Sequence, residues 1–196
     1  PIRKAVDKVS KREDTSDFSV AAFVRMLYLD RQHPSLPNEA RALIEHGVLN
    51  FKYWFDEAGE DKMAYWSENH QALFHSSELL AGQLWPDRVF PNAGMTGRDH
   101  VRHAEGRMER WLDFRGMFGF SEWHSNVYFN EDIPALVNLV DFAENDRIRV
   151  KAAMVLDLMA FDFLNNMYAG LFATVHGRTY PEHLLDGQRD STREAA

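Results

Sequence analysis

The chain has 196 residues, of which 45% are hydrophobic, and 22 Lys and Arg stand against 30 Asp and Glu for a net charge of −8. This length and composition suffice for one sizeable core, so they argue against disorder and favour a single helical domain over residues 1–196. The acidic balance without a basic block argues against nucleic acid as a partner, and the absence of cysteine excludes disulfides and thiolate sites.

Helical periodicity recurs along the chain and alternating strand patterns are almost absent, so we predict an all-α fold built of helical hairpins. The predicted helices are, in chain order, 4–14, 16–31, 38–56, 65–85, 98–119, 133–145 and 146–175. The predicted caps are Ser16 or Asp17, Asn38, Ser67 and Asp132, and the predicted helix ends lie at Gly59, Pro86, Gly116 to Gly119 and Gly177.

The last predicted helix is apolar on all sides. Val150, Met154 and Phe161 mark one stripe and Val155 lies on another, so we expect this helix to be buried all round, as an inner layer of a two-layer helical assembly. Asp157 interrupts the stripe, and a buried carboxylate needs a partner or a water-filled cavity. Asp157 is either part of a structural salt bridge or a substrate-binding residue that lines a central cleft.

The segment YWSENHQALFHSSELLAGQLW, residues 65–85, carries the first group of candidate site residues. If Ser67 is the cap, Glu68, Asn69 and His70 occupy the first turn, where free N–H groups and the helix dipole favour an anion. We expect these three residues to stabilise a carboxylate or a developing negative charge, with Trp66 beside them as a substrate-binding residue. The alternative is that Asn69 and His70 form interhelical hydrogen bonds in the core.

The segment GFSEWHSNVYFNED, residues 119–132, carries the second group. Its aromatic side chains, including Trp123 and Tyr128, alternate with Glu122 and His124, and such a mixture suits a sugar that stacks on a ring while its hydroxyl groups bind polar side chains. Glu122 lies beside Trp123, where a raised pKa and general-acid behaviour would arise. The alternative is that the rings close the end of the helical core.

The segment VHGRTYPEH, residues 175–183, follows the last long helix and carries the third group. We expect His176 and Arg178 to meet the other two groups if all three lie on one rim, and Arg178 to pair with a substrate carboxylate, with Glu122 or with Asp157. The alternative is a simple helix cap followed by a polar turn.

Metal and cofactor sites are not predicted. His100 and His103 in HVRH have helical spacing, but the HExxH pattern and cysteine are absent, so we interpret them as a solvated helix face. No phosphate-binding glycine loop and no dinucleotide fingerprint occurs.

Helical hairpins with a tryptophan followed by ENH, a later SEW…NVY loop and a buried helix that bears an aspartate resemble the (α/α) toroid of carbohydrate-active enzymes. The pair Asn69 and His70 resembles the Asn-His pair of alginate-lyase and heparinase-type polysaccharide lyases. In that family the Asn and His neutralise a uronate carboxylate or act near its C5 proton, a Tyr or His is base and acid, and an Arg supports them. The pattern is also similar to that of uncharacterised bacterial proteins.

The resemblance implies catalytic roles for Asn69 and His70 by motif. By residue type alone it implies roles for Tyr128 and His124 as proton-transfer groups and for Arg115 and Arg178 in support. Where the family has its first Asn, this chain has Glu68, which brings a repulsive charge near an anionic substrate.

The sequence thus predicts an enzyme acting on a carbohydrate polymer, by β-elimination or, through Glu68 and Glu122, by glycoside hydrolysis. The alternative is a non-catalytic helical scaffold or binding domain. The predicted helices make only half of a closed toroid, so we expect either an open array or a segment of a longer protein whose remainder is a partner.

The compartment stays open. No apolar run reaches the roughly 18 residues of a membrane span, and no signal peptide is visible. The chain begins with Pro1, which indicates a processed or excised chain and is compatible with the loss of a targeting segment. Zero cysteines do not separate a cytosolic protein from an extracytoplasmic one; of these we favour an extracytoplasmic bacterial protein.

Overall fold

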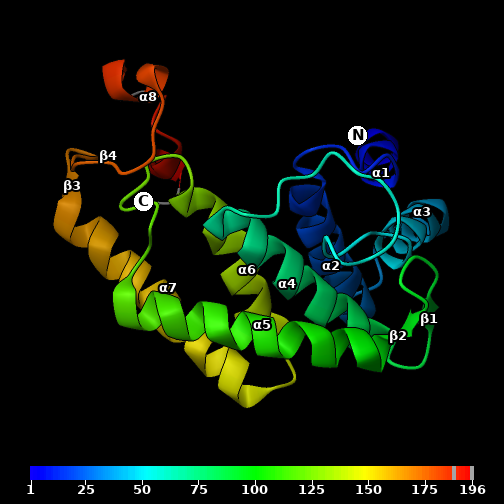
Figure 1. The fold of residues 1–196 in the computed structure, drawn as a ribbon. Coiled ribbons are helices and arrows are strands. Elements are labelled where there is room, and N and C mark those ends of the chain that lie inside the picture. The colour runs from blue at the N-terminus through cyan, green and yellow to red at the C-terminus, as the bar shows by residue number, and fades with distance from the viewer. Residues whose placement is uncertain (187–188, 195–196) are drawn as a thin grey trace.

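A computed structural model describes residues 1–186 and 189–194 of the chain, and this part is mostly helical, as predicted (Figure 1). Its helices are α1 (Ile2–Ser10), α2 (Ser16–Gln32), α3 (Asn38–Leu49), α4 (Glu68–Leu84), α5 (Gly97–Phe118), α6 (Phe129–Phe142), α7 (Asp146–Asn166), α8 (Pro181–Leu185) and the 3-10 turn η2 (Ser191–Glu194). Two short antiparallel pairs join β1 (Val89–Phe90) to β2 (Met95–Thr96) and β3 (Met167–Tyr168) to β4 (Leu171–Phe172). Within the described residues, no helix has both the length and the apolar character to cross a membrane.

Helix α4 lies at the centre of the molecule, between the N-terminal helices α1 to α3 and the helices α5 to α7 (Figure 1). Every residue of α4 except Gln71 is buried, and the helix packs against α2, α5 and α6. Leu73, Phe74 and Leu79 project in different directions because successive residues of a helix are about 100° apart. The fully buried position that the sequence predicts for the last long helix is therefore held by α4.

Helix α7 is buried on one side only, so the predicted all-round burial of the last helix is wrong. Its buried residues recur at helical spacing and face α5 and α6; they are Ile148, Ala152, Val155, Met159 and Phe163. Its apolar stripe of Val150, Met154 and Phe161 is exposed. Asp157 is also exposed, so its predicted burial is wrong and its carboxylate needs no protein partner.

The end of α7 differs from the prediction because a hairpin follows it. Helix α7 ends at Asn166, and Ala169 and Gly170 then turn the chain with positive φ angles of 51° and 77°. Two consecutive residues with positive φ are typical of the two-residue turns that connect antiparallel strands. The chain thus leaves the helix well before Gly177, the predicted end.

Three other helices also begin or end at residues that differ from the predicted ones. Helix α3 ends at Leu49, and the residues after it, including Tyr53 and Trp54, enter the core without helical structure. Helix α5 continues through Gly116 to Phe118. Helix α6 begins at Phe129, so Asp132 lies inside its first turn and is not its cap.

Helices α4 and α5 approach each other closely where both have glycine. A Cβ atom added to Gly82 would lie 2.5 Å from the carbonyl oxygen of Gly97 and 2.9 Å from Cγ2 of Val101. A Cβ atom added to Gly97 would meet the backbone of Trp85 and Gly82. Only glycine at these two positions permits the observed separation of the helices.

We expect Gly82→Ala to lower the free energy of unfolding by about 1–3 kcal/mol, because the added methyl group forces α4 and α5 apart. Urea denaturation followed by circular dichroism measures this change. The matched control is Gly116→Ala, since a Cβ atom there has open space around it. The control should be neutral or gain up to about 1 kcal/mol from the better helix propensity of alanine. Equal effects of the two substitutions would contradict the proposed close contact.

Candidate functional site

Glu68, the first residue of α4, connects this helix to the loop between α5 and α6. Its carboxylate forms an ion pair with Arg115 of α5 and accepts the backbone N–H groups of Ser121 at 2.8 Å and Glu122 at 2.7 Å. Glu68 and Arg115 are both buried. Because donors occupy both oxygen atoms, this arrangement favours a structural role for Glu68 over a role as free acid or base.

The two residues after Glu68 are also buried. Asn69 is fully buried, and its Oδ1 accepts the hydroxyl of Ser67 at 2.7 Å. His70 lies with its Nδ1 2.6 Å from Oδ2 of Asp17 in α2. This interhelical contact favours the structural alternative for His70, whereas Trp66 is 80% exposed.

The loop between α5 and α6 and the segment between β4 and α8 lie side by side, so the second and third groups of candidate residues do meet. The backbone N–H of Gly177 donates to the carbonyl of Trp123 at 2.7 Å, and the hydroxyl of Ser125 donates to the carbonyl of Arg178 at 2.6 Å. These bonds hold together what we call the aromatic rim, which comprises Glu122, Trp123, Tyr128, Arg178 and Tyr180.

Arg178 is the centre of the aromatic rim. Its Nη1 lies 2.5 Å from Oε1 of Glu122, and its Cζ lies 3.6 Å from the centre of the Tyr128 ring. Its Nη2 donates to the hydroxyl of Tyr180 at 3.4 Å. Of the partners predicted for Arg178, Glu122 is therefore the one observed.

The two tyrosines of the rim have different proton affinities. Their hydroxyl oxygens lie 2.6 Å apart. Burial and the hydrogen bond to Tyr180 raise the pKa of Tyr128 to about 12, whereas the hydrogen bonds from Tyr128 and Arg178 lower the pKa of Tyr180 below its usual 10.0. Because one hydrogen bond joins the two hydroxyl groups, a proton can pass between them, as an acid and base pair requires.

The histidines near the rim are less accessible than Tyr180. His124 is buried, has a positive φ of 45°, and stacks on Trp123 with ring centres 4.1 Å apart. The Nδ1 of His176 donates to the carbonyl of His124 at 2.6 Å. Trp123 itself is half-exposed, so its ring remains available as a platform for a sugar.

A buried carboxyl group lies near the rim. Asp132 in α6 is buried, and one of its oxygens has no hydrogen-bond partner among the described residues. Burial and the neighbouring charge of Glu122 raise the pKa of Asp132 well above its usual value, although Arg115 opposes the shift. Burial therefore favours the neutral form of the Asp132 carboxyl group.

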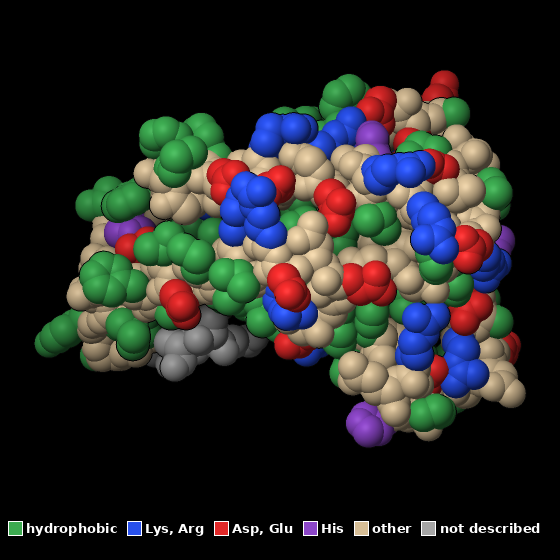
Figure 2. Space-filling view, turned by 90° about the horizontal axis from the view of Figure 1, so that it is seen from below, with side chains coloured by type: hydrophobic (Ala, Val, Ile, Leu, Met, Phe, Trp, Pro, Cys, Tyr) green, Lys and Arg blue, Asp and Glu red, His purple; other side chains and the backbone are tan. Residues whose placement is uncertain are grey.

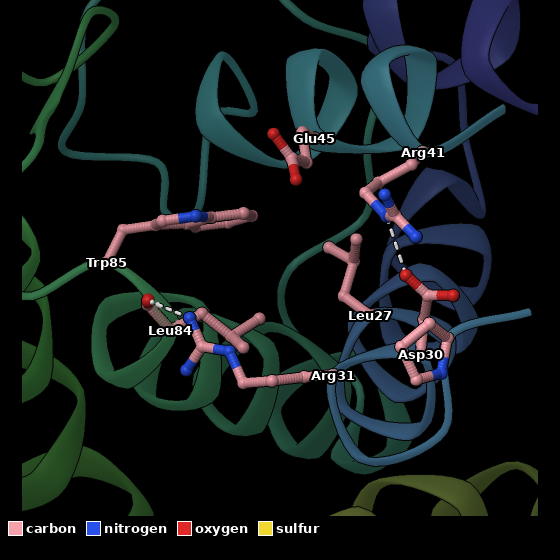
Figure 3. A pocket seen from close by; sticks show the side chains of 8 residues that line it. Leu27, Asp30, Arg31, Arg41, Glu45, Leu84 and Trp85 are labelled. Atoms are coloured by element: carbon pink, nitrogen blue, oxygen red, sulfur yellow. Dashed lines mark hydrogen bonds and ion pairs between the residues drawn. The ribbon is translucent and has the colours of Figure 1, made fainter. Parts of the chain in front are cut away.

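A pocket of about 310 Å³ that the sequence analysis did not identify lies between α2, α3 and the end of α4 (Figure 3). Its lining residues are Leu27, Asp30, Arg31, Pro34, Arg41, Glu45, Leu84 and Trp85. Arg41 pairs with Asp30 at 2.6 Å, and Arg31 donates to the carbonyl of Leu84 at 2.9 Å. The sequence signal was only that charged residues and a tryptophan lie at the ends of α2 and α4.

The pair His100 and His103 is not the solvated helix face that the sequence predicts. His100 is 1% exposed, and its Nδ1 lies 2.8 Å from Oε1 of Glu78. The Nδ1 of His103 lies 2.7 Å from the same oxygen. The prediction failed because Glu78 is on α4, and its pairing with α5 requires the tertiary contact.

Comparisons of the chain with models of known protein families, with curated proteins and with solved structures gave no match. The resemblance to polysaccharide lyases thus stays a prediction from short motifs. We therefore infer a function from the geometry of the residues themselves.

We expect Glu68→Gln to lower the free energy of unfolding by about 3–5 kcal/mol, because it leaves the buried Arg115 without its counter-charge. The measurement is urea denaturation at neutral pH. The control Asp87→Asn removes an exposed carboxylate that pairs with Arg98, so its cost should stay below about 1 kcal/mol. A Glu68 variant as stable as the wild type would contradict the anchoring role.

We expect Asp132→Asn to stabilise the protein at neutral pH but much less at acidic pH. Since the folded-state pKa is raised, the contribution of Asp132 is favourable below the unfolded value of 3.8 and is lost as the pH rises towards the folded value. The wild type should thus lose up to about 1.4 kcal/mol per pH unit relative to the variant. Unfolding of both proteins at about pH 4 and about pH 7 measures the difference. The same stability difference at the two pH values would refute a buried neutral Asp132.

Proposed function

We propose that this chain acts on an acidic polysaccharide by β-elimination at the aromatic rim. The observation that carries the proposal is the arrangement of Tyr180, an exposed phenol with a lowered pKa, 2.6 Å from Tyr128 and beside Arg178. An accessible phenol, a second phenol hydrogen-bonded to it and a cation beside them are the groups that can serve as base, acid and charge stabiliser in this reaction.

In β-elimination a uronate unit loses the C5–H bond and the C4–O bond, and a C4=C5 double bond forms. Tyr180, as the phenolate, takes the C5 proton, and Tyr128 donates its proton to the leaving oxygen. Arg178 lies over the ring of Tyr128 and donates to the hydroxyl of Tyr180, and it stabilises the negative charge that develops on the carboxylate. The half-exposed Trp123 stacks against a neighbouring sugar ring.

In the proposed mechanism, the residues at the start of α4 support the aromatic rim. Glu68 fixes the backbone of the rim through the N–H groups of Ser121 and Glu122, and it does not contact the sugar. Glycoside hydrolysis has less support, because it needs two available carboxyl groups and both candidates, Glu68 and Glu122, are paired with arginines.

A non-catalytic helical scaffold is the second candidate, and an exposed apolar surface favours it. The outer apolar face comprises Phe114, Met117, Val150, Met154, Leu158, Phe161 and Leu164. A groove of about 580 Å³ runs along it between α5 and α7, and Figure 2 shows hydrophobic side chains gathered at the end of the molecule where α7 terminates. Surfaces of this kind are typical of interaction sites.

The same face is compatible with the finer architecture that we propose, an open or partial (α/α) toroid. Helices α4 and α5 pack against each other as consecutive helices, and so do α6 and α7. A further layer of helices from the remainder of a longer chain would cover the outer apolar face.

The test is a panel of uronic-acid polymers and neutral polysaccharides, read by the absorbance of unsaturated uronate and by a reducing-sugar assay. We expect the first signal from at least one acidic polymer. Tyr180→Phe should lower kcat by at least about 100-fold without changing the melting temperature. The matched control is Tyr168→Phe, an exposed tyrosine outside the rim, which should keep full activity.

The results of this panel distinguish elimination, hydrolysis and a non-catalytic scaffold. Reducing ends without unsaturated products would support hydrolysis and reject the elimination mechanism. Full activity of Tyr180→Phe would reject the role of the rim. A folded protein without activity on any polymer of the panel would favour the scaffold.

A further inference from the structure

A second polar cluster is buried between α4, α5 and the segment that follows α3. Glu57, Glu78 and His100 each bring one potential ligand atom to within 4.8 Å of the other two. Glu78 and His100 are almost completely buried, and Glu57 is half-buried. Carboxylates are rarely buried unless they are paired or bind a metal ion.

Two buried polar atoms of this cluster have no hydrogen-bond partner within the described part of the chain. They are Oε2 of Glu78 and Nε2 of His100. A buried polar atom without a partner costs about 1–3 kcal/mol, so such atoms are rare in folded proteins. The free Oε2 of the fully buried Glu78 points to a ligand that this carboxylate binds in addition to its histidine partners.

The surroundings orient the potential ligands. The Nδ1 of His100 lies 2.8 Å from Oε1 of Glu78, so Nδ1 is the ring nitrogen on the side of the carboxylate. An ion shared by His100 and Glu78 takes the place of the proton between them, because metal binding releases protons from its ligands. Glu57 is held by the side chain of Asn92 at 2.7 Å and by the backbone N–H of Tyr53 at 3.1 Å. Hydrogen bonds of this kind to ligand residues are typical of metal sites.

We propose that Glu57, Glu78 and His100 bind one divalent transition-metal ion, of the class that includes Zn²⁺. Two carboxylates and one imidazole form the mixed oxygen and nitrogen set that suits Zn²⁺, Mn²⁺ or Fe²⁺ better than Ca²⁺ or Mg²⁺. The ion neutralises the charges of Glu57 and Glu78 and ties the segment that carries Glu57 to α4 and α5. This site is independent of the aromatic rim, and its role is structural.

The test uses the whole chain, freed of metal with a chelator and titrated with Zn²⁺ by calorimetry and with Co²⁺ by visible absorption. We expect one ion per chain, a visible cobalt spectrum that reports coordination by nitrogen and oxygen, and a rise of the melting temperature of about 5 °C or more at saturating Zn²⁺. No saturable binding would overturn the proposal.

Two variants test whether the metal ion binds at Glu57, Glu78 and His100. Glu57→Gln should weaken the affinity for Zn²⁺ by at least about 10-fold while the protein stays folded, since Glu57 is half-buried and glutamine keeps a hydrogen-bonding oxygen. The control is His46→Gln, which removes an exposed histidine of α3 and should leave the affinity unchanged. Unchanged affinity of Glu57→Gln, or its loss in His46→Gln, would show binding elsewhere and reject the site.

Discussion

The burial of α4 along its whole length is the constraint on which the rest of the structure depends. A buried helix that carries Glu68, His70 and Glu78 must receive its partners from its neighbours, since unpaired charges in a core are costly. Asp17 of α2 and Arg115 of α5 meet this need at one end, and the histidines of α5 meet it further along. These polar pairs set the register of α4 against α2 and α5.

The position of the aromatic rim follows from this constraint. Two backbone N–H groups of the loop that bears Glu122 donate to the carboxylate of Glu68 in the first turn of α4, and the segment that bears Arg178 is fixed to that loop. The exposed groups of the aromatic rim are thus held in place through the buried carboxylate of Glu68. Rigid support of this kind is what the precise placement of reactive groups requires.

The sequence predicted the all-α class and most of the helices, because these depend on local periodicity and turn residues. It also named Glu122 as one of three possible partners of Arg178, and this is the partner observed. It failed where a partner is distant in sequence: the first turn of α4 suggested an anion site, but the pairing of Glu68 with Arg115 depends on tertiary packing. The burial of α7 was misjudged because apolar composition does not reveal whether neighbouring helices cover every side.

The pairing of Glu68 with Arg115 has a consequence for how the sequence can diverge. Loss of either side chain alone leaves a buried charge, and an apolar residue at position 68 also leaves the N–H groups of Ser121 and Glu122 without their acceptor. Positions 68 and 115 are thus expected to co-vary among descendants of this chain, and a substitution at one position would restrict which residues natural selection accepts at the other.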